Sequence, residues 1–226
     1  SCDLFYSQNN GRNWSKPVNL GPKINSKHWE TQPSFSSDGK TLYFIRGMTY
    51  DRQRRNPNNQ DIYVTTITED GQWSNPKKIS SNINTPYREE SVQIHPDGKT
   101  LYFASNGHPG MGGLDIYMSR KLEDDSWSKP INLGYPLNTF VDENSILISP
   151  KGDLGYFSSN RDGGFGDLDL YSFILNDHMD FSYAWHAGVL DQFWNEFTSK
   201  QEIQISAESA LPVHRLIDAI IHSSEL

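Results

Sequence analysis

Short runs of alternating apolar and polar residues, separated by turn residues, follow one another along most of the chain. One set of such runs covers residues 91–94, 100–104, 114–119 and 127–133. The tetrapeptide Pro96–Lys99 has the composition of a hairpin turn between the first two runs. Because no helical period lies between the runs, the pattern predicts an all-β fold made of short strands.

A set of landmarks recurs in constant order, which identifies tandem repeats of about 54 residues. A tripeptide of Asp, an aliphatic and an aromatic residue occurs at 3–5, 61–63, 115–117 and 169–171, in steps of 58, 54 and 54 residues. The motif Trp-Ser-x-Pro occurs at 14–17, 73–76 and 127–130. An Asn followed by Ser or Thr, with a Glu five residues later, gives the pairs Asn25 and Glu30, Asn84 and Glu89, and Asn138 and Glu143.

Four strands per repeat are typical of one blade of a β-propeller, in which antiparallel sheets pack face to face. A single blade cannot cover both of its apolar faces, so neighbouring blades have to stabilise one another. We therefore predict an all-β propeller segment of four-stranded antiparallel blades. The expected units are a partial blade 1–28, blades 29–87 and 88–141, and a partial blade 142–176.

The repeats resemble the PD40 family, the TolB-like or WD40-like propeller repeat, over residues 1–176. The stretches that carry the resemblance are 14–21, 97–117 and 156–161. The closest likeness is to propellers of OmpA-family cell-envelope proteins of Bacteroidetes-type bacteria. In that family the propeller often precedes a small transthyretin-like domain and a peptidoglycan-binding OmpA domain, and some members serve type IX secretion.

This resemblance implies a non-catalytic scaffold in the periplasm or at the outer membrane. The implied partner is a protein or peptide of the envelope, or a peptidoglycan-associated component.

The segment 177–226 carries none of the landmarks and is expected to be an appendage. Its apolar residues from Leu190 to Phe197 have helical spacing, and the stretch after Pro212 reads as a short amphipathic helix. The stretches 188–191 and 200–206 alternatively resemble the first strands of a transthyretin-like domain.

Charge and hydropathy exclude two classes of function. The 226 residues include 20 basic and 28 acidic side chains, so a net charge of −8 argues against non-specific binding to nucleic acid. No apolar run approaches the roughly 18 residues that a transmembrane helix needs. The single cysteine, Cys2, rules out an internal disulfide.

Three carboxylates, Glu30, Glu89 and Glu143, are candidates for a binding site because each precedes the first strand of a blade. In a propeller these positions would converge around the central channel, where acidic side chains attract a cation or a basic peptide. Internal hydrogen bonding between blades is the favoured alternative.

Two loops supply further candidate binding residues. The insertion 46–60 contains Arg46, Arg54 and Arg55, whose guanidinium groups suit carboxylate or phosphate. The glycine-rich loop after the second strand of the next blade contains Asn106 and His108. A solvated loop with no ligand is the favoured alternative for the arginine insertion.

The glycines of 107–113 and 163–166 are expected to adopt positive φ in tight connections, because no helix follows them to complete a phosphate site. A calcium site at Asp162, Asp167 and Asp169 is an alternative. The seven histidines show no metal-ligand spacing, so we predict no metal and no cofactor.

The competing function is a sialidase-like propeller that binds or hydrolyses glycans. Residues 7–14 fit the Asp-box pattern of such propellers with Asn in place of Asp. That box is structural, and the other blades lack it at the same place. A sialidase would also need an arginine triad and a tyrosine–glutamate pair. For a second enzyme class, a peptidase of the propeller-plus-hydrolase type, the chain has no Gly-x-Ser-x-Gly nucleophile motif. A non-catalytic function is therefore the favoured prediction.

Overall fold

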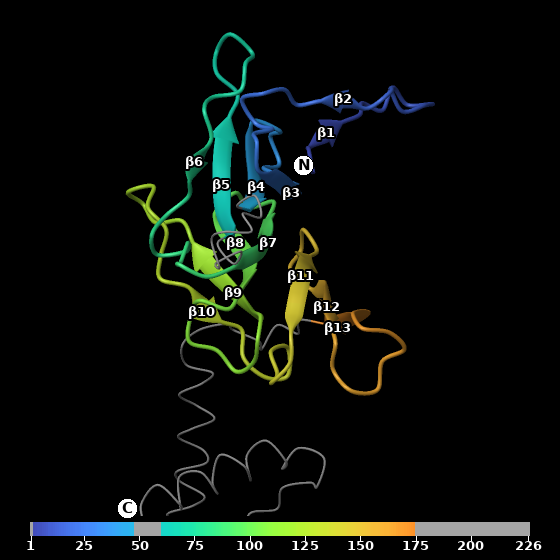
Figure 1. Ribbon diagram of the computed structural model, residues 1–226, viewed down its shortest axis with the longest axis vertical. Coiled ribbons are helices and arrows are strands. Elements are labelled where there is room, and N and C mark those ends of the chain that lie inside the picture. Colours follow the sequence, from blue (N-terminus) through green and yellow to red (C-terminus); the bar gives the residue numbers. More distant parts are fainter. Residues whose placement is uncertain (1, 48–59, 175–226) are drawn as a thin grey trace, which may run out of the picture. The chain divides into compact units, whose positions relative to one another are not determined.

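The computed structural model describes residues 2–47 and 60–174, and every helix or strand assigned within them is a β-strand (Figure 1). An N-terminal hairpin consists of β1 (Phe5–Tyr6) and β2 (Val18–Asn19). The first blade consists of β3 (Trp29–Phe35), β4 (Thr41–Gly47), β5 (Gln60–Thr66) and β6 (Lys77–Lys78). The second blade consists of β7 (Glu89–Ile94), β8 (Thr100–Ser105), β9 (Asp115–Arg120) and β10 (Ile131–Asn132). The third sheet consists of β11 (Glu143–Ile148), β12 (Leu154–Ser159) and β13 (Asp169–Ile174).

The strand pairing confirms the predicted fold class. Both blades are four-stranded, and their strands pair antiparallel in sequence order. Asp61, Asp115 and Asp169 lie opposite Arg46, Ser105 and Ser159 in equivalent registers, as tandem repeats require. The predicted boundary between 176 and 177, and the whole predicted appendage, lie outside the described residues.

The hairpin between the first two strands of each unit is built in the same way. Gly39, Gly98 and Gly152 have φ of +67°, +67° and +74°, a left-handed conformation that glycine adopts without strain. In the second blade, Asp97 accepts the backbone N–H groups of Lys99 and Thr100, both at 2.8 Å. These bonds fix the turn and with it the register of the two inner strands.

The fourth strand is much shorter than the sequence predicted. The expected strand 127–133 is reduced to β10, which is Ile131–Asn132, and an isolated bridge between Trp127 and Lys121. Pro130 directly precedes β10, and a proline has no N–H to give to the ladder. Pro17 and Pro76 precede β2 and β6 in the same way.

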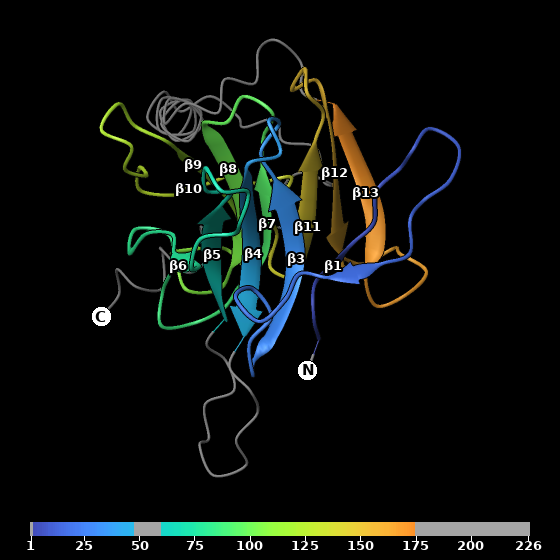
Figure 2. The same ribbon diagram turned by 90° about the horizontal axis from the view of Figure 1, so that it is seen from above.

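The first strands of consecutive sheets, β3, β7 and β11, lie side by side (Figure 2). Side chains join them where no ladder forms. Gln93 accepts the N–H of Ile148 at 2.8 Å and donates to its carbonyl at 3.2 Å. Ser34 accepts the N–H of Ile94 at 3.0 Å. Each inner strand is therefore fixed to the next blade through polar side chains.

The main apolar core lies between the two complete blades. Tyr43, Ile45 and Ile62 of the first blade are buried against residues of the second blade. Trp127 is 6 % exposed and makes an edge-to-face contact with Tyr43 at 6.4 Å between ring centroids. The prediction that this tryptophan fills the gap between blades is confirmed. The sequence predicted that Trp73 and Trp127 would be buried in equivalent environments. Trp73 is only half-buried, so this part of the prediction is wrong.

We expect Trp127→Ala to lower the free energy of unfolding by about 3–5 kcal/mol, because it removes a large buried ring and leaves a cavity. Trp14→Ala is the matched control, since Trp14 has the same place in its repeat but is 69 % exposed. Urea denaturation measures both variants. Losses of similar size would contradict the assignment of Trp127 to the joint between blades.

Candidate functional site

The repeated asparagines clamp the third strand of each unit. The side chain of Asn138 accepts the N–H of Ile116 at 2.8 Å and donates to the carbonyl of the same residue at 2.8 Å. Asn84 makes the same two bonds to Ile62 at 2.9 and 3.0 Å. Asn25 makes them to Leu4. Each asparagine therefore ties the segment that follows the fourth strand to the third strand of the same blade.

The repeated glutamates cap the segment that follows each asparagine. Glu143 accepts the N–H of Thr139 at 2.8 Å and its hydroxyl at 2.6 Å. Glu30 makes the corresponding bonds with Ser26, and Glu89 with Thr85. The Asn-Ser/Thr-x-x-x-Glu spacing is thus one local device at the entry to the first strand of each blade.

Two of the three glutamates also pair with arginine. Arg46 donates to Glu30 at 2.8 Å, and Arg161 donates to Glu143 at 3.2 Å. Glu89 and Glu143 each accept a serine hydroxyl at 3.0 Å, from Ser105 and Ser159, but in the described part of the chain no ion pair reaches Glu89. Burial raises the pKa of Glu89 to about 7, against the lowering effect of its hydrogen bonds from Thr85 and Ser105.

Each of these arginines also stacks on the aromatic pair of its blade. The guanidinium carbon of Arg161 lies 4.8 Å from the ring centroid of Phe157 and 5.0 Å from that of Tyr171. The same group donates to the carbonyl of Leu137 at 2.8 Å. Arg46 stacks in the same way and donates to the corresponding carbonyl, that of Ile24, at 2.7 Å. Such contacts combine cation–π attraction with capping of a carbonyl.

His108 takes the place of the arginine in the second blade. Its ring lies 5.8 Å from Phe103 and 5.2 Å from Tyr117, measured between centroids. Its Nε2 lies 2.8 Å from the carbonyl oxygen of Ile83, the residue before the asparagine of that repeat. The tautomer that donates to this oxygen reproduces the arginine contact without a permanent charge.

The three carboxylates of the predicted site are buried, each within its own repeat. Glu30, Glu89 and Glu143 are 0–1 % exposed, and their oxygens are held by their own repeats. These hydrogen bonds are mostly local, whereas the sequence suggested bonds between blades. Binding of a partner by these carboxylates stays a prediction.

The other predicted binding residues are dispersed. The Asn106 side chain accepts the N–H of Arg88 at 3.0 Å, which ties the glycine-rich loop to the start of the blade. Arg46 is brought to Glu30, and His108 lies against its own aromatic pair. Arg54 and Arg55 fall outside the described residues.

The glycine-rich loop corrects one expectation. Positive φ occurs at Gly163, at +92°, but at none of the glycines of 107–113. Those glycines permit close approach instead. A Cβ on Gly112 would lie 2.2 Å from the carbonyl oxygen of Val141, and one on Gly110 would lie 1.7 Å from an Asp115 carboxylate oxygen. Only glycine allows the loop to pass so near the next unit.

The close approach lets the repeated aspartate cap the loop. Asp115 accepts the N–H of Met111 at 2.6 Å, and Asp169 accepts those of Phe165 and Gly166 at 2.7 and 3.1 Å. The predicted architectural role of this aspartate is confirmed in both units. Within 2–47 and 60–174, no group of three His, Cys, Asp or Glu side chains is placed to hold a metal ion.

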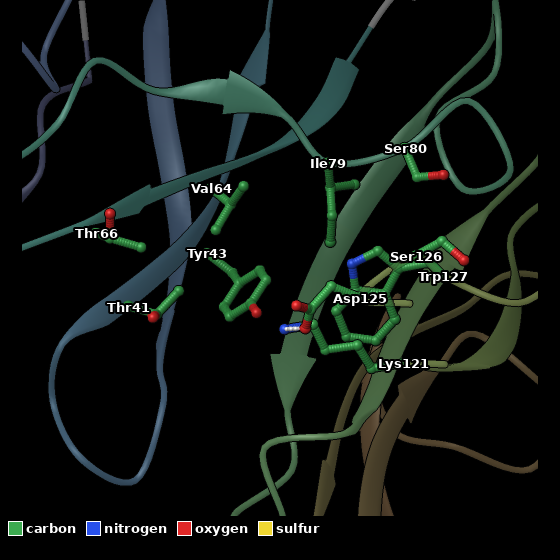
Figure 3. Close-up of a pocket in the computed structure, with 10 residues that line it drawn as sticks. All are labelled: Thr41, Tyr43, Val64, Thr66, Ile79, Ser80, Lys121, Asp125, Ser126 and Trp127. Carbon is green, nitrogen blue, oxygen red and sulfur yellow. Dashed lines mark ion pairs between the residues drawn. The ribbon is translucent and has the colours of Figure 1, made fainter. Parts of the chain in front are cut away.

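A pocket that the sequence did not predict lies between the two complete blades (Figure 3). Its volume is about 410 Å³. The first blade contributes Thr41, Tyr43, Val64 and Thr66, followed by Ile79 and Ser80, and the second blade contributes Lys121, Asp125, Ser126 and Trp127. The recurrence of Tyr43 and Trp127 in the sequence predicts that they lie between blades. It does not predict that packing of the two blades leaves a pocket next to them.

The chemistry of this pocket suits binding. Tyr43 and Trp127 form its aromatic part, and the ion pair of Lys121 with Asp125, at 2.7 Å, contributes charge of both signs. Burial, and to a smaller extent Asp38, raises the pKa of Tyr43, so its hydroxyl stays protonated at neutral pH. The pocket can receive a small apolar or aromatic group and offer hydroxyl groups beside it.

No protein-family model and no curated protein matches this chain. Among solved structures it is similar to TolB from Acinetobacter baumannii, with 16 % identity and a TM-score of 0.47 over 77 % of this chain and 39 % of that one. A Mycobacterium tuberculosis puromycin-hydrolyzing peptidase gives 14 % identity and 0.47 over 76 % and 29 %. The NanB sialidase from Streptococcus pneumoniae gives 17 % and 0.40 over 77 % and 27 %.

The chain spans less than half the length of each of these proteins. With TM-scores below 0.5 the likenesses carry no argument, and the fold assignment comes from the strand pairing. No helix able to cross a membrane occurs in residues 2–47 and 60–174.

The glutamate without an arginine predicts a pH dependence of stability. Folded protein holds the Glu89 proton up to about pH 7, whereas the ordinary pKa is 4.5. Wild-type stability should therefore fall as pH rises between these values, and the loss should be complete above pH 7. Because Glu89→Gln cannot ionise, its stability relative to the wild type should increase by about 1–3 kcal/mol from pH 5 to pH 8.

Urea denaturation across this range measures the effect. Glu143→Gln is the matched control, and it should be destabilising at pH 7 because Arg161 loses its carboxylate partner. Identical pH profiles for wild type and Glu89→Gln would contradict the role assigned to Glu89.

Proposed function

We propose that this chain is a non-catalytic binding scaffold whose inter-blade pocket receives an apolar or aromatic side chain of a protein or peptide partner. The observation that supports this most directly is the pocket itself, in which Tyr43 and Trp127 from different blades provide the aromatic part. A rigid pair of blades holds these rings in place before any ligand arrives, so little ordering accompanies binding.

The placement of the reactive side chain types supports a non-catalytic role. Glu30 and Glu143 are bound to arginines, and Asp115 and Asp169 hold loop N–H groups. His108 lies on the aromatic pair of its blade. These five side chains, which could otherwise act as acids, bases or metal ligands, are thus engaged in contacts within the sheets and their loops.

The setting proposed is the bacterial cell envelope, periplasmic or attached to the outer membrane. Its support is the resemblance of the repeats to PD40 propellers of OmpA-family proteins. A partner of the peptidoglycan-associated type, and a link to type IX secretion, belong to the same proposal. The net charge of −8 favours a partner that carries basic residues beside its apolar one.

Selection of peptides from a random display library on the immobilised protein tests the pocket. Enriched peptides should share an apolar or aromatic residue. Thr66→Trp, which places a large ring at an exposed position of the pocket wall, should weaken their binding at least about tenfold. Fluorescence anisotropy with labelled peptides measures the change.

Ser37→Trp is the matched control, because it adds the same ring to the exposed β3–β4 turn outside the pocket. Peptides that bind both variants as well as wild type would show that the pocket is not the site. Release of the fluorophore from a sialoside substrate by purified protein would contradict the non-catalytic proposal and support the sialidase-like alternative.

A further inference from the structure

The pocket between the two complete blades is bordered by short side chains on the first blade. Val64 and Thr66 line it, three and five residues after the repeated aspartate of their blade. The second blade carries the longer side chains of Met118 and Arg120 at the same two positions of its repeat. The composition of the wall is therefore particular to this joint, and both walls belong to complete blades.

Asp125 brings charge to this pocket from an uncommon backbone conformation. Its φ is +64°, and Gly71, which also stands two residues before the tryptophan of its repeat, has a φ of +75°. Glycine adopts this left-handed conformation without strain, whereas a residue with a Cβ adopts it at a cost in energy. The second blade thus has a carboxylate beside the pocket at the repeat position where the first blade has no side chain.

The carboxylate of Asp125 is only partly engaged. Its Oδ1 accepts a hydrogen bond from the Lys121 ammonium at 2.7 Å, and among the described residues no hydrogen bond reaches its Oδ2. The Asp125 side chain is 85 % exposed, and an ion pair this exposed contributes little to stability. Figure 3 shows the pair on the side of the pocket that the second blade forms, with Tyr43 of the first blade facing it. Another cation can therefore replace Lys121 at low cost.

Acidic side chains of both blades lie near the pocket. Asp38 is close enough to Tyr43 that its charge, after burial, raises the pKa of the tyrosine. Asp124 directly precedes Asp125, and hydrogen bonds from Ser126 lower the pKa of Asp124, so it is charged at neutral pH. These charges favour a cationic group over an anionic one beside the pocket.

We propose that Asp125 binds an arginine of the partner peptide, next to the residue that the pocket holds, and that this arginine displaces Lys121. A guanidinium group can donate to both oxygens of a carboxylate, whereas the Lys121 ammonium holds only one of them. The inference rests on the proposed function, because it names a second residue of the same peptide and the side chain that selects it.

Fluorescence anisotropy with short labelled peptides tests the selection. Each peptide has one Trp as the anchor in a Gly-Ser frame, with Arg, Gln or Glu on both sides of it. The Arg peptide should bind about three- to tenfold more tightly than the Gln peptide at low salt, because it gains a charge-assisted contact. The Glu peptide should bind more weakly than either. Raising the salt concentration should narrow these differences, since the contact is exposed.

Two variants of the acidic turn separate contact from overall charge. Asp125→Asn should abolish the preference for Arg over Gln, and it should keep the turn because asparagine tolerates the left-handed conformation. Asp124→Asn is the matched control, since it removes the same charge from the adjacent residue, which does not line the pocket. This control should keep the preference.

The displacement of Lys121 predicts an effect of opposite sign. Lys121→Met keeps an apolar stem and removes the competing cation, so the Arg peptide should bind about two- to fivefold more tightly than to wild type. Binding of the Gln peptide should stay unchanged. Lys129→Met is the matched control, because it removes the same charge from an exposed lysine of the same blade outside the pocket.

The two proposals fail in different ways. Absence of binding for all three peptides, or binding that Thr66→Trp leaves unchanged, would contradict the proposed function and with it the role of Asp125. If Thr66→Trp weakens every peptide while wild type binds the Arg and Gln peptides equally, the pocket stands and the role of Asp125 is overturned. A preference that survives Asp125→Asn, or an Arg peptide that binds Lys121→Met no better than wild type, would also overturn it.

Discussion

The structure depends on the pair of hydrogen bonds that each repeated asparagine makes to the backbone of a third strand. The outer strand β10 ends at Asn132, so the N–H of Ile116 has no ladder partner beyond it, and the Asn138 side chain accepts it. The same side chain donates to the Ile116 carbonyl. An unpaired buried N–H would cost about 1–3 kcal/mol. The asparagine thus satisfies the strand and at the same time fixes the segment that leads to the next blade.

The glutamate caps and the stacked cations extend this clamp to the neighbouring unit. Glu143 orders the residues directly after Asn138, and Arg161 connects Glu143 to the carbonyl of Leu137 just before it. The residues on both sides of Asn138 are therefore held in place, Leu137 by Arg161 and Thr139 by Glu143. The second blade keeps the geometry with His108 in place of arginine and leaves Glu89 without a cation among the described residues. The raised pKa of Glu89 is therefore expected to make the stability of the second blade fall as pH rises.

Sequence periodicity predicted the blades well because the landmarks are local. Spacing alone located the strands, the hairpin glycines such as Gly98 and the tryptophan between blades, Trp127. It predicted a fourth strand that is too long, because an alternating pattern of apolar and polar residues takes no account of the missing N–H of Pro130. It misread Gly112, whose role depends on the carbonyl of Val141, in the segment that leads to the third sheet.

The candidate sites were harder to predict than the fold for the same physical reason. The direction in which the Glu89 carboxylate turns depends on Thr85 and Ser105, and only the folded blade brings Ser105 to it. The inter-blade pocket has walls that are far apart in sequence, from Thr41 to Trp127. Which residues recur is visible in one sequence, whereas the space left between packed sheets is not.

Native-state hydrogen exchange of the backbone amides of Ile62 and Ile116 tests the asparagine clamp most directly. Both amides donate to asparagine side chains and to no strand partner. The account predicts protection factors equal to those of ladder amides in β8, and a loss at Ile116 but not at Ile62 in Asn138→Ala, with the blade still folded. Wild-type amides at Ile62 and Ile116 that exchange as fast as those of exposed turns would contradict it.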